Sequence, residues 1–205
     1  MSATFLHGAA AGARSRRQAA GAALLFGCLL ASTTGCNTPS ANHEMQQVSP
    51  PVHGRQHAEP VRLRIPAIGV NAPIGPLQVD NRVLPPPKDY QKTGWWRDGP
   101  EPGEPGPAVI IGHLDTARGP AVFFRLSELR THDAIFVEKA DGTTAVFTTQ
   151  RIERHRKDRF PTQAVYGPTS DPQLRLITCS GSYDHQAHRY RDNLIAYAVQ
   201  AHPKD

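Results

Sequence analysis

The sequence predicts an all-β body behind an N-terminal segment that does not belong to it. Its 205 residues include 19 prolines and 17 glycines, and no long stretch repeats apolar residues at helical spacing. Short apolar or alternating runs recur instead between turn-forming residues. This pattern is typical of a barrel or sandwich of short strands with one or two helical turns. The length allows one domain of ordinary size plus appendages.

Residues 1–36 resemble an export signal. A basic start is followed by the apolar run Ala19–Ala31, which has signal-peptide length but is short for a membrane span. Gly35-Cys36 then resembles a lipoprotein processing site, at which Cys36 becomes the lipidated first residue. A cleaved signal and an uncleaved signal anchor stay open as alternatives. All three routes attach or deliver the body to the outer face of the cytoplasmic membrane, so an extracytoplasmic location is expected.

Residues 37–60 are rich in Pro, Ser, Gln, Asn and His and poor in apolar residues. Such a segment buries too little surface to offset the entropy lost on ordering. We expect a flexible extracytoplasmic stalk. Its three histidines, His43, His53 and His57, leave a metal-binding tail as an alternative. The folded domain is expected over 61–205.

The first predicted strands of the body are short. Val61–Ile65 alternates apolar and basic residues, as a half-buried strand does. Asn71–Ile74 is a second brief strand, which Pro73 is expected to confine to a sheet edge. Ala108–Ile111 is a continuous apolar run, typical of a strand buried on both faces.

The middle of the body predicts a short helix and a hairpin. Phe123–Arg130 has apolar residues at three-residue spacing, which favours a short helix. Ile135–Glu138 and Thr143–Arg154 are predicted to pair as strands around Asp141-Gly142, because Asp-Gly is a strong hairpin signal. A basic link and a proline-containing loop follow, up to Pro172.

The last two predicted strands bring a thiol close to a guanidinium. If Leu174–Thr178 and Leu194–Val199 pair across the polar loop between them, Cys179 and Arg191 lie at one edge of the sheet. Arginine is always charged and favours the thiolate, which is the nucleophilic form of cysteine. The other two of the three cysteines lie in the N-terminal segment, so Cys179 is expected to be a free thiol.

A histidine stands at the end of another predicted strand. His113 follows the buried run by two residues. If that strand lies parallel to the strand of Cys179 and beside it, both side chains project at the same edge, next to Arg191. Each residue also has a structural alternative. Cys179 could be a buried structural cysteine and His113 a structural histidine. Arg191 could form an ion pair with Asp184 or Asp192.

Taken together these residues resemble the signature of sortases: Ile177-Thr178-Cys179, an arginine before the last strand and a histidine at an upstream strand end. The resemblance covers Val61 to Ala201 and is strongest to class F sortases of actinobacteria. Ser180-Gly181 departs from the family, in which Gly-Gly is commoner. The class F resemblance is carried by Arg64–Val70, Gly94–Trp96, Gly103–Asp115, Gly119–Leu129, Asp158–Gly167 and Leu174–Ser180.

The resemblance implies a closed eight-stranded β-barrel with one or two short helices, acting as a cysteine transpeptidase. Cys179 is implied to attack a C-terminal sorting signal and form a thioacyl-enzyme, with His113 as the proton carrier. Arg191 is implied to position the substrate and stabilise the oxyanion, and Arg189 is the alternative residue for this role. The acceptor is implied to be an amine, such as that of a cell-wall precursor, or water. No cofactor and no metal are expected.

Other functions fit the sequence less well. The net charge of +5 comes from scattered Lys and Arg, which does not indicate a nucleic-acid surface. In papain-like enzymes the nucleophile precedes its histidine, whereas here His113 comes first. A zinc hydrolase built from His113, Asp115, His132 and Cys179 lacks paired-ligand spacing. A non-catalytic extracytoplasmic lipoprotein binding domain is the non-enzyme alternative, and it would leave Cys179 and His113 apart.

Overall fold

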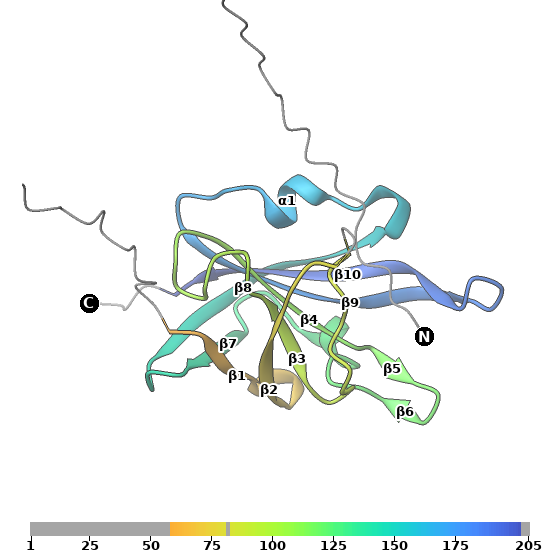
Figure 1. Cartoon of the computed structure of the whole chain (residues 1–205), viewed down its shortest axis with the longest axis horizontal. Coiled ribbons are helices and arrows are strands. Elements are labelled where there is room, and N and C mark those ends of the chain that lie inside the picture. Colours follow the sequence, from red (N-terminus) through yellow and green to blue (C-terminus); the bar gives the residue numbers. More distant parts are fainter. Residues whose placement is uncertain (1–57, 81–82, 202–205) are drawn as a thin grey trace, which may run out of the picture. The chain divides into compact units, whose positions relative to one another are not determined.

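A computed structural model describes residues 58–80 and 83–201 of the chain. Eight strands close into a barrel in the order β1-β2-β3-β4-β9-β10-β8-β7 (Figure 1). The predicted all-β class and the eight-stranded barrel are confirmed. The predicted signal peptide, residues 1–36, and all but the last three residues of the predicted stalk, 37–60, lie outside the described residues.

Two further strands, β5 and β6, pair with each other outside the barrel. In order, the elements are β1 (Pro60–Ile65), the 3-10 turn η1 (Pro66–Ile68), β2 (Val70–Leu77), β3 (Thr93–Trp96), β4 (Gly106–Gly112), β5 (Asp115–Thr116), β6 (Gly119–Pro120), η2 (Leu126–Glu128), β7 (Ala134–Lys139), β8 (Thr144–Arg156), η3 (Lys157–Arg159), α1 (Thr162–Tyr166), β9 (Pro172–Asp184) and β10 (Arg189–Gln200).

Strand β4 is buried along its whole length and contributes side chains to two apolar clusters. Ala108 and Ile110 point into the barrel core, whereas Val109 and Ile111 belong to a second apolar cluster outside the barrel wall. That outer cluster also contains Val165 of α1 and Ile177 of β9. Because both faces of β4 are covered, its sequence is continuously apolar rather than alternating.

Three expected elements differ in form. β2 is longer than predicted and is an interior strand, so the edge position expected from Pro73 was wrong. Pro73 pairs with Arg62 of β1, but the pairing of β2 with β3 starts only at Ile74. The proline therefore lies where β2 has one neighbour. The helix expected over Phe123–Arg130 is reduced to the single turn η2, and the α-helix is α1, in the segment expected to be a loop.

The hairpin of β9 and β10 is longer than its apolar pattern indicates. Ser180–Asp184, expected in a polar loop, continue β9, and Cys179 therefore lies within a strand. In Figure 1 this blue hairpin extends past the other barrel strands. A two-stranded ribbon beyond the barrel has no core to face, so its sequence carries no apolar signal.

Gly181 places a bulge in this hairpin. Tyr190 pairs with Tyr183 and Asp192 with Ser180, so β9 has one residue more than β10 between these pairs. Gly181 has a φ of 77°, and a Cβ atom there would lie 2.3 Å from a carboxylate oxygen of Asp192. Both features require glycine. The bulge lies two residues beyond Cys179 and bends the ribbon there.

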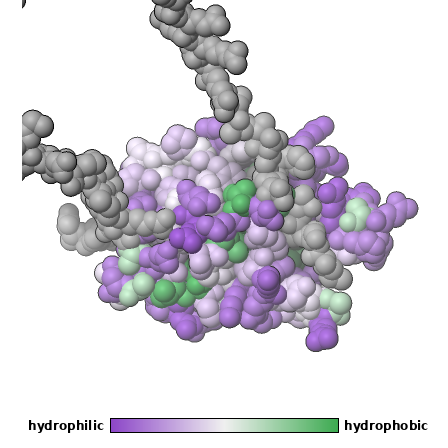
Figure 2. Space-filling model, in the orientation of Figure 1, coloured by the Kyte–Doolittle hydropathy of each residue, from purple (hydrophilic) through white to green (hydrophobic). Residues whose placement is uncertain are grey.

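The surface of the domain is largely polar. The face shown in Figure 2 is mainly hydrophilic, with small apolar patches. The large hydrophobic residues exposed in the described part of the chain are Val61, Val79, Tyr90 and Phe124. Scattered apolar side chains of this kind are normal on protein surfaces.

Candidate active site

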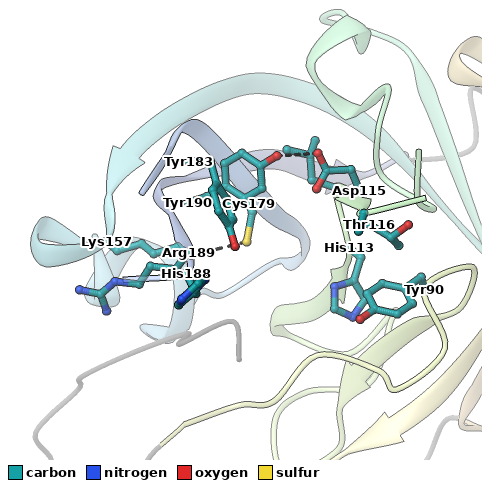
Figure 3. A pocket seen from close by; sticks show the side chains of 12 residues that line it. Tyr90, His113, Asp115, Thr116, Lys157, Cys179, Tyr183, His188, Arg189 and Tyr190 are labelled. Atoms are coloured by element: carbon teal, nitrogen blue, oxygen red, sulfur yellow. Dashed lines mark hydrogen bonds between the residues drawn. The ribbon is translucent and has the colours of Figure 1, made fainter. Parts of the chain in front are cut away.

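The strand register brings Cys179 and His113 to one place. β4 and β9 are neighbouring parallel strands, and Ile111 pairs with Ile177. His113 and Cys179 each follow this pair by two residues, so they lie at the same level along the two neighbouring strands. Both side chains line a cavity of about 280 Å³ (Figure 3). This is the arrangement that a shared proton-transfer site needs, and it is not the separation expected of a non-catalytic domain.

The Cys179 thiol is nearly enclosed. It is 9% exposed and is the free cysteine of the described residues. The Nζ atom of Lys157, in η3, lies 3.5 Å from its Sγ atom. Burial raises the pKa of Cys179, the Lys157 ammonium group opposes this, and Asp115 adds to the rise. Because the net shift is upward, the thiol form predominates at neutral pH in the free protein.

The His113 imidazole is held by the segment before β3. Its Nε2 atom lies 2.8 Å from the carbonyl oxygen of Pro87. A carbonyl oxygen only accepts hydrogen bonds, so Nε2 carries the proton and the neutral ring keeps Nδ1 as its basic atom. The Tyr90 ring packs against the imidazole with centroids 4.4 Å apart. Sequence reasoning missed both contacts, because a proline-rich connection gives no signal of what it covers.

Tyr190 and Asp115 close the cavity on another side. The Tyr190 hydroxyl donates a 2.5 Å hydrogen bond to Asp115 Oδ2, which joins β10 to the segment after His113 (Figure 3). Burial and this carboxylate raise the pKa of Tyr190 to about 12. The phenol therefore stays protonated at neutral pH and acts as a fixed donor. The sequence had given no role to Tyr190, and Asp115 was considered there as a ligand in the zinc alternative.

The two candidate arginines differ in position. Arg189 lines the cavity. Arg191 is exposed, and its Nη2 atom lies 3.4 Å from Oδ2 of Asp184. Asn193 pairs with Cys179, and the extra residue of the bulge is on β9. Alternation along β10 therefore puts Arg191 on the same side of the sheet as Cys179, two residues closer to it than Arg189.

The zinc alternative finds no support in side-chain placement. Within 58–80 and 83–201, no three His, Cys, Asp or Glu side chains are grouped so that they could hold a metal ion. His132 lies on the turn before β7 and does not line the cavity of Cys179 and His113.

A free cysteine and a histidine that line one cavity of a closed barrel are the groups that acyl transfer through a thioester would use. The family model described as Sortase domain matches residues 63–201. The chain therefore belongs to the sortase family, whose members are cysteine transpeptidases that act on sorting-signal proteins and amine acceptors. Sortases generally work at the cell surface, on the outer face of the membrane.

Solved structures of sortases A and C have the same fold. Sortase A from Corynebacterium diphtheriae, as a lid mutant, is 21% identical, with 73% of each chain covered and a TM-score of 0.56. Sortase C-1 from Actinomyces oris is also 21% identical, with 70% of this chain and 74% of that chain covered and a TM-score of 0.55. Sortase C of Streptococcus pneumoniae is 17% identical, with 69% and 65% covered and a TM-score of 0.53.

No curated protein matches the sequence significantly. In the part of the chain that the structure describes, every helix is too short or too polar to span a lipid bilayer.

Proposed function

We propose that this sortase is of the class F type and that Cys179, His113 and Arg191 carry its chemistry. The class F assignment rests on the six sequence stretches that run from Arg64 to Ser180. The catalytic assignment rests mainly on one observation: Cys179 and His113 follow the paired residues Ile177 and Ile111 by two positions and line the same cavity. Its substrate is a C-terminal sorting signal, and its acceptor an amine, such as that of a cell-wall precursor, or water.

In the acylation step the Cys179 sulfur attacks the carbonyl carbon of the scissile peptide bond. The thiol proton passes to Nδ1 of His113, because Nε2 is engaged by Pro87. As the tetrahedral intermediate collapses, the carbon–nitrogen bond breaks and the imidazolium gives this proton to the departing amine. A thioacyl-enzyme remains on Cys179, and the site has neither gained nor lost a proton.

In the second step an amine or water attacks the thioester carbonyl. The nucleophile loses a proton to His113, the carbon–sulfur bond breaks, and His113 returns the proton to the Cys179 sulfur. The raised pKa of Cys179 means that the thiolate–imidazolium pair is scarce in the free enzyme. Turnover should therefore fall as the pH rises through the raised pKa of Cys179, because the proton that His113 passes to the departing amine comes from this thiol.

The experiment that tests the proposed function uses the purified full chain and a panel of fluorogenic sorting-signal peptides. We expect cleavage of at least one peptide, and a mass shift equal to the added amine when a free amine is supplied. Hydrolysis product alone would identify water as the acceptor. No cleavage of any panel peptide, with a folded protein, would contradict the proposed activity.

The oxyanion role of Arg191 predicts a ranking of two variants. Arg191→Lys should reduce turnover on the order of 100-fold, because lysine keeps the charge but not the planar fork that fixes two donors. Arg189→Lys should cost far less, because Arg189 lies farther along the ribbon from Cys179. The contact of Arg191 with Asp184 is an exposed ion pair, so it does not hold Arg191 away from a substrate. Steady-state kinetics with one peptide decide, and the reverse ranking would move the role to Arg189.

We also propose that Cys36 is the lipidated N-terminus and that the chain is attached by it to the outer face of the membrane. The motif Gly35-Cys36 after an apolar run supports this. Mass spectrometry of the native N-terminus is expected to show a chain that begins at a diacylated Cys36. An unmodified start elsewhere would show signal cleavage, and an intact Met1 would show a signal anchor.

A further inference from the structure

The cation in contact with the candidate nucleophile is a lysine, and not one of the arginines considered from the sequence. Lys157 is half-buried, lines the cavity, and has its Nζ atom 3.5 Å from Cys179 Sγ. In Figure 3 its side chain reaches toward the sulfur from the side opposite His113. The thiol thus lies between an ammonium group and the proposed proton carrier.

The sheet register explains how a residue 22 positions earlier reaches the thiol. β8 and β10 are antiparallel, and Asp192 pairs with Arg156. Lys157 follows Arg156, and Arg191 precedes Asp192. Because the strands are antiparallel, Lys157 therefore lies at the level of Arg191. Two cations therefore reach the same level of the sheet. In this structure Lys157 contacts the sulfur, and Arg191 contacts Asp184.

Other charged and titratable groups also face the sulfur. From the β9–β10 hairpin, the cavity receives Tyr183, His188, Arg189 and Tyr190. From the segment after β4 it receives His113 and Asp115, and Tyr90 lies beyond His113. Asp115 disfavours the thiolate, and so does burial of the sulfur. Lys157 is the cation within hydrogen-bonding distance of the sulfur, and its charge acts in the opposite direction.

We propose that Lys157 is a positioning residue for the reaction: its ammonium group holds the Cys179 sulfur and favours its thiolate form before substrate binds. The inference rests on the proposed role of Cys179 as the nucleophile. An opposite charge within about 4–6 Å of a titratable group lowers the pKa of an acid by about 1–3 units. Replacing Lys157 by a neutral side chain should therefore raise the pKa of Cys179 further.

The test measures alkylation of Cys179 by iodoacetamide against pH, in the full chain without any peptide substrate. Digestion and mass spectrometry follow the fragment that contains Cys179 and separate it from Cys28 and Cys36. We expect Lys157→Met to raise the apparent pKa of Cys179 by about one unit or more and to slow alkylation at pH 7 about tenfold. Lys157→Arg, which keeps a cation, should restore most of the rate.

Arg159→Met is the matched control, because it removes an exposed positive charge two residues away that does not line the cavity. Its alkylation profile should stay within about twofold of the parent. Thermal unfolding confirms that each variant is folded. If Lys157→Met titrates like the parent, or if Arg159→Met shifts the profile equally, the inference is wrong. The alkylation test uses no peptide substrate and does not depend on turnover. If the proposed peptide cleavage fails, the failure appears in the peptide assay, and the alkylation profile of Cys179 stays the same.

Discussion

Replacing Cys179 with alanine should reduce peptide cleavage to the uncatalysed background, a loss of at least about 1,000-fold. No other cysteine lies within the described residues, so nothing else at this cavity can form a thioester. The change removes one sulfur atom from the cavity wall, and the cost in folding free energy should be on the order of 1 kcal/mol. Steady-state cleavage of one peptide measures the loss of activity, and unfolding followed by circular dichroism measures the change in folding free energy.

Cys179→Ser is the matched comparison for this variant. Serine preserves the size of the side chain but not the acidity and nucleophilicity of the thiol, so activity should stay close to that of the alanine variant. Turnover within about tenfold of the parent in the alanine variant would refute the assignment of Cys179 as the nucleophile.

Replacing His113 with alanine should lower turnover by about 100- to 10,000-fold, which is the usual contribution of a positioned proton carrier. Both half-reactions need that proton, so cleavage and transfer should fall together. Single-turnover and steady-state rates of the variant, measured from acidic to alkaline pH, provide the comparison.

His132→Asn is the control for this prediction. His132 lies outside the cavity and has a φ of 73°, a conformation that asparagine tolerates. We expect its activity to stay within a few-fold of the parent. If His113→Ala is equally mild, the proton carrier is another residue, and His188, which also lines the cavity, becomes the candidate.

Much of the fold follows from local sequence because the strands that form the core have one-sided or fully buried faces. The alternation of Val61–Ile65 and the continuous apolar run of Ala108–Ile111 each predict their strands correctly. The ends of β9 and β10 could not be predicted this way, since the ribbon beyond Cys179 lies outside the barrel core and consists mostly of polar residues. Pro73 was misleading because its effect depends on which neighbour a strand has at that residue, and the sequence does not contain that information.

From the sequence, His113 and Cys179 could be expected at one edge of the sheet, but the residues that surround them could not be. His113 and Cys179 are marked by the buried strands that precede them, and the parallel pairing of β4 with β9 then brings them together. Strand register and the paths of the loops bring Lys157, Tyr90 and Tyr190 to the cavity from distant parts of the sequence. In the same way, the carbonyl oxygen of Pro87 comes to lie beside His113. For this reason the cation beside the thiol was expected to be Arg191, whereas the structure places Lys157 there.

The most direct test of this account is the capture of the acyl-enzyme. The purified chain is mixed with a cleavable sorting-signal peptide, quenched in acid within one turnover and digested for mass spectrometry. We expect the fragment containing Cys179 to gain the mass of the peptide portion before the scissile bond, and hydroxylamine to remove this mass. Cleavage with an unmodified Cys179, or with the acyl group on another residue, would contradict this expectation.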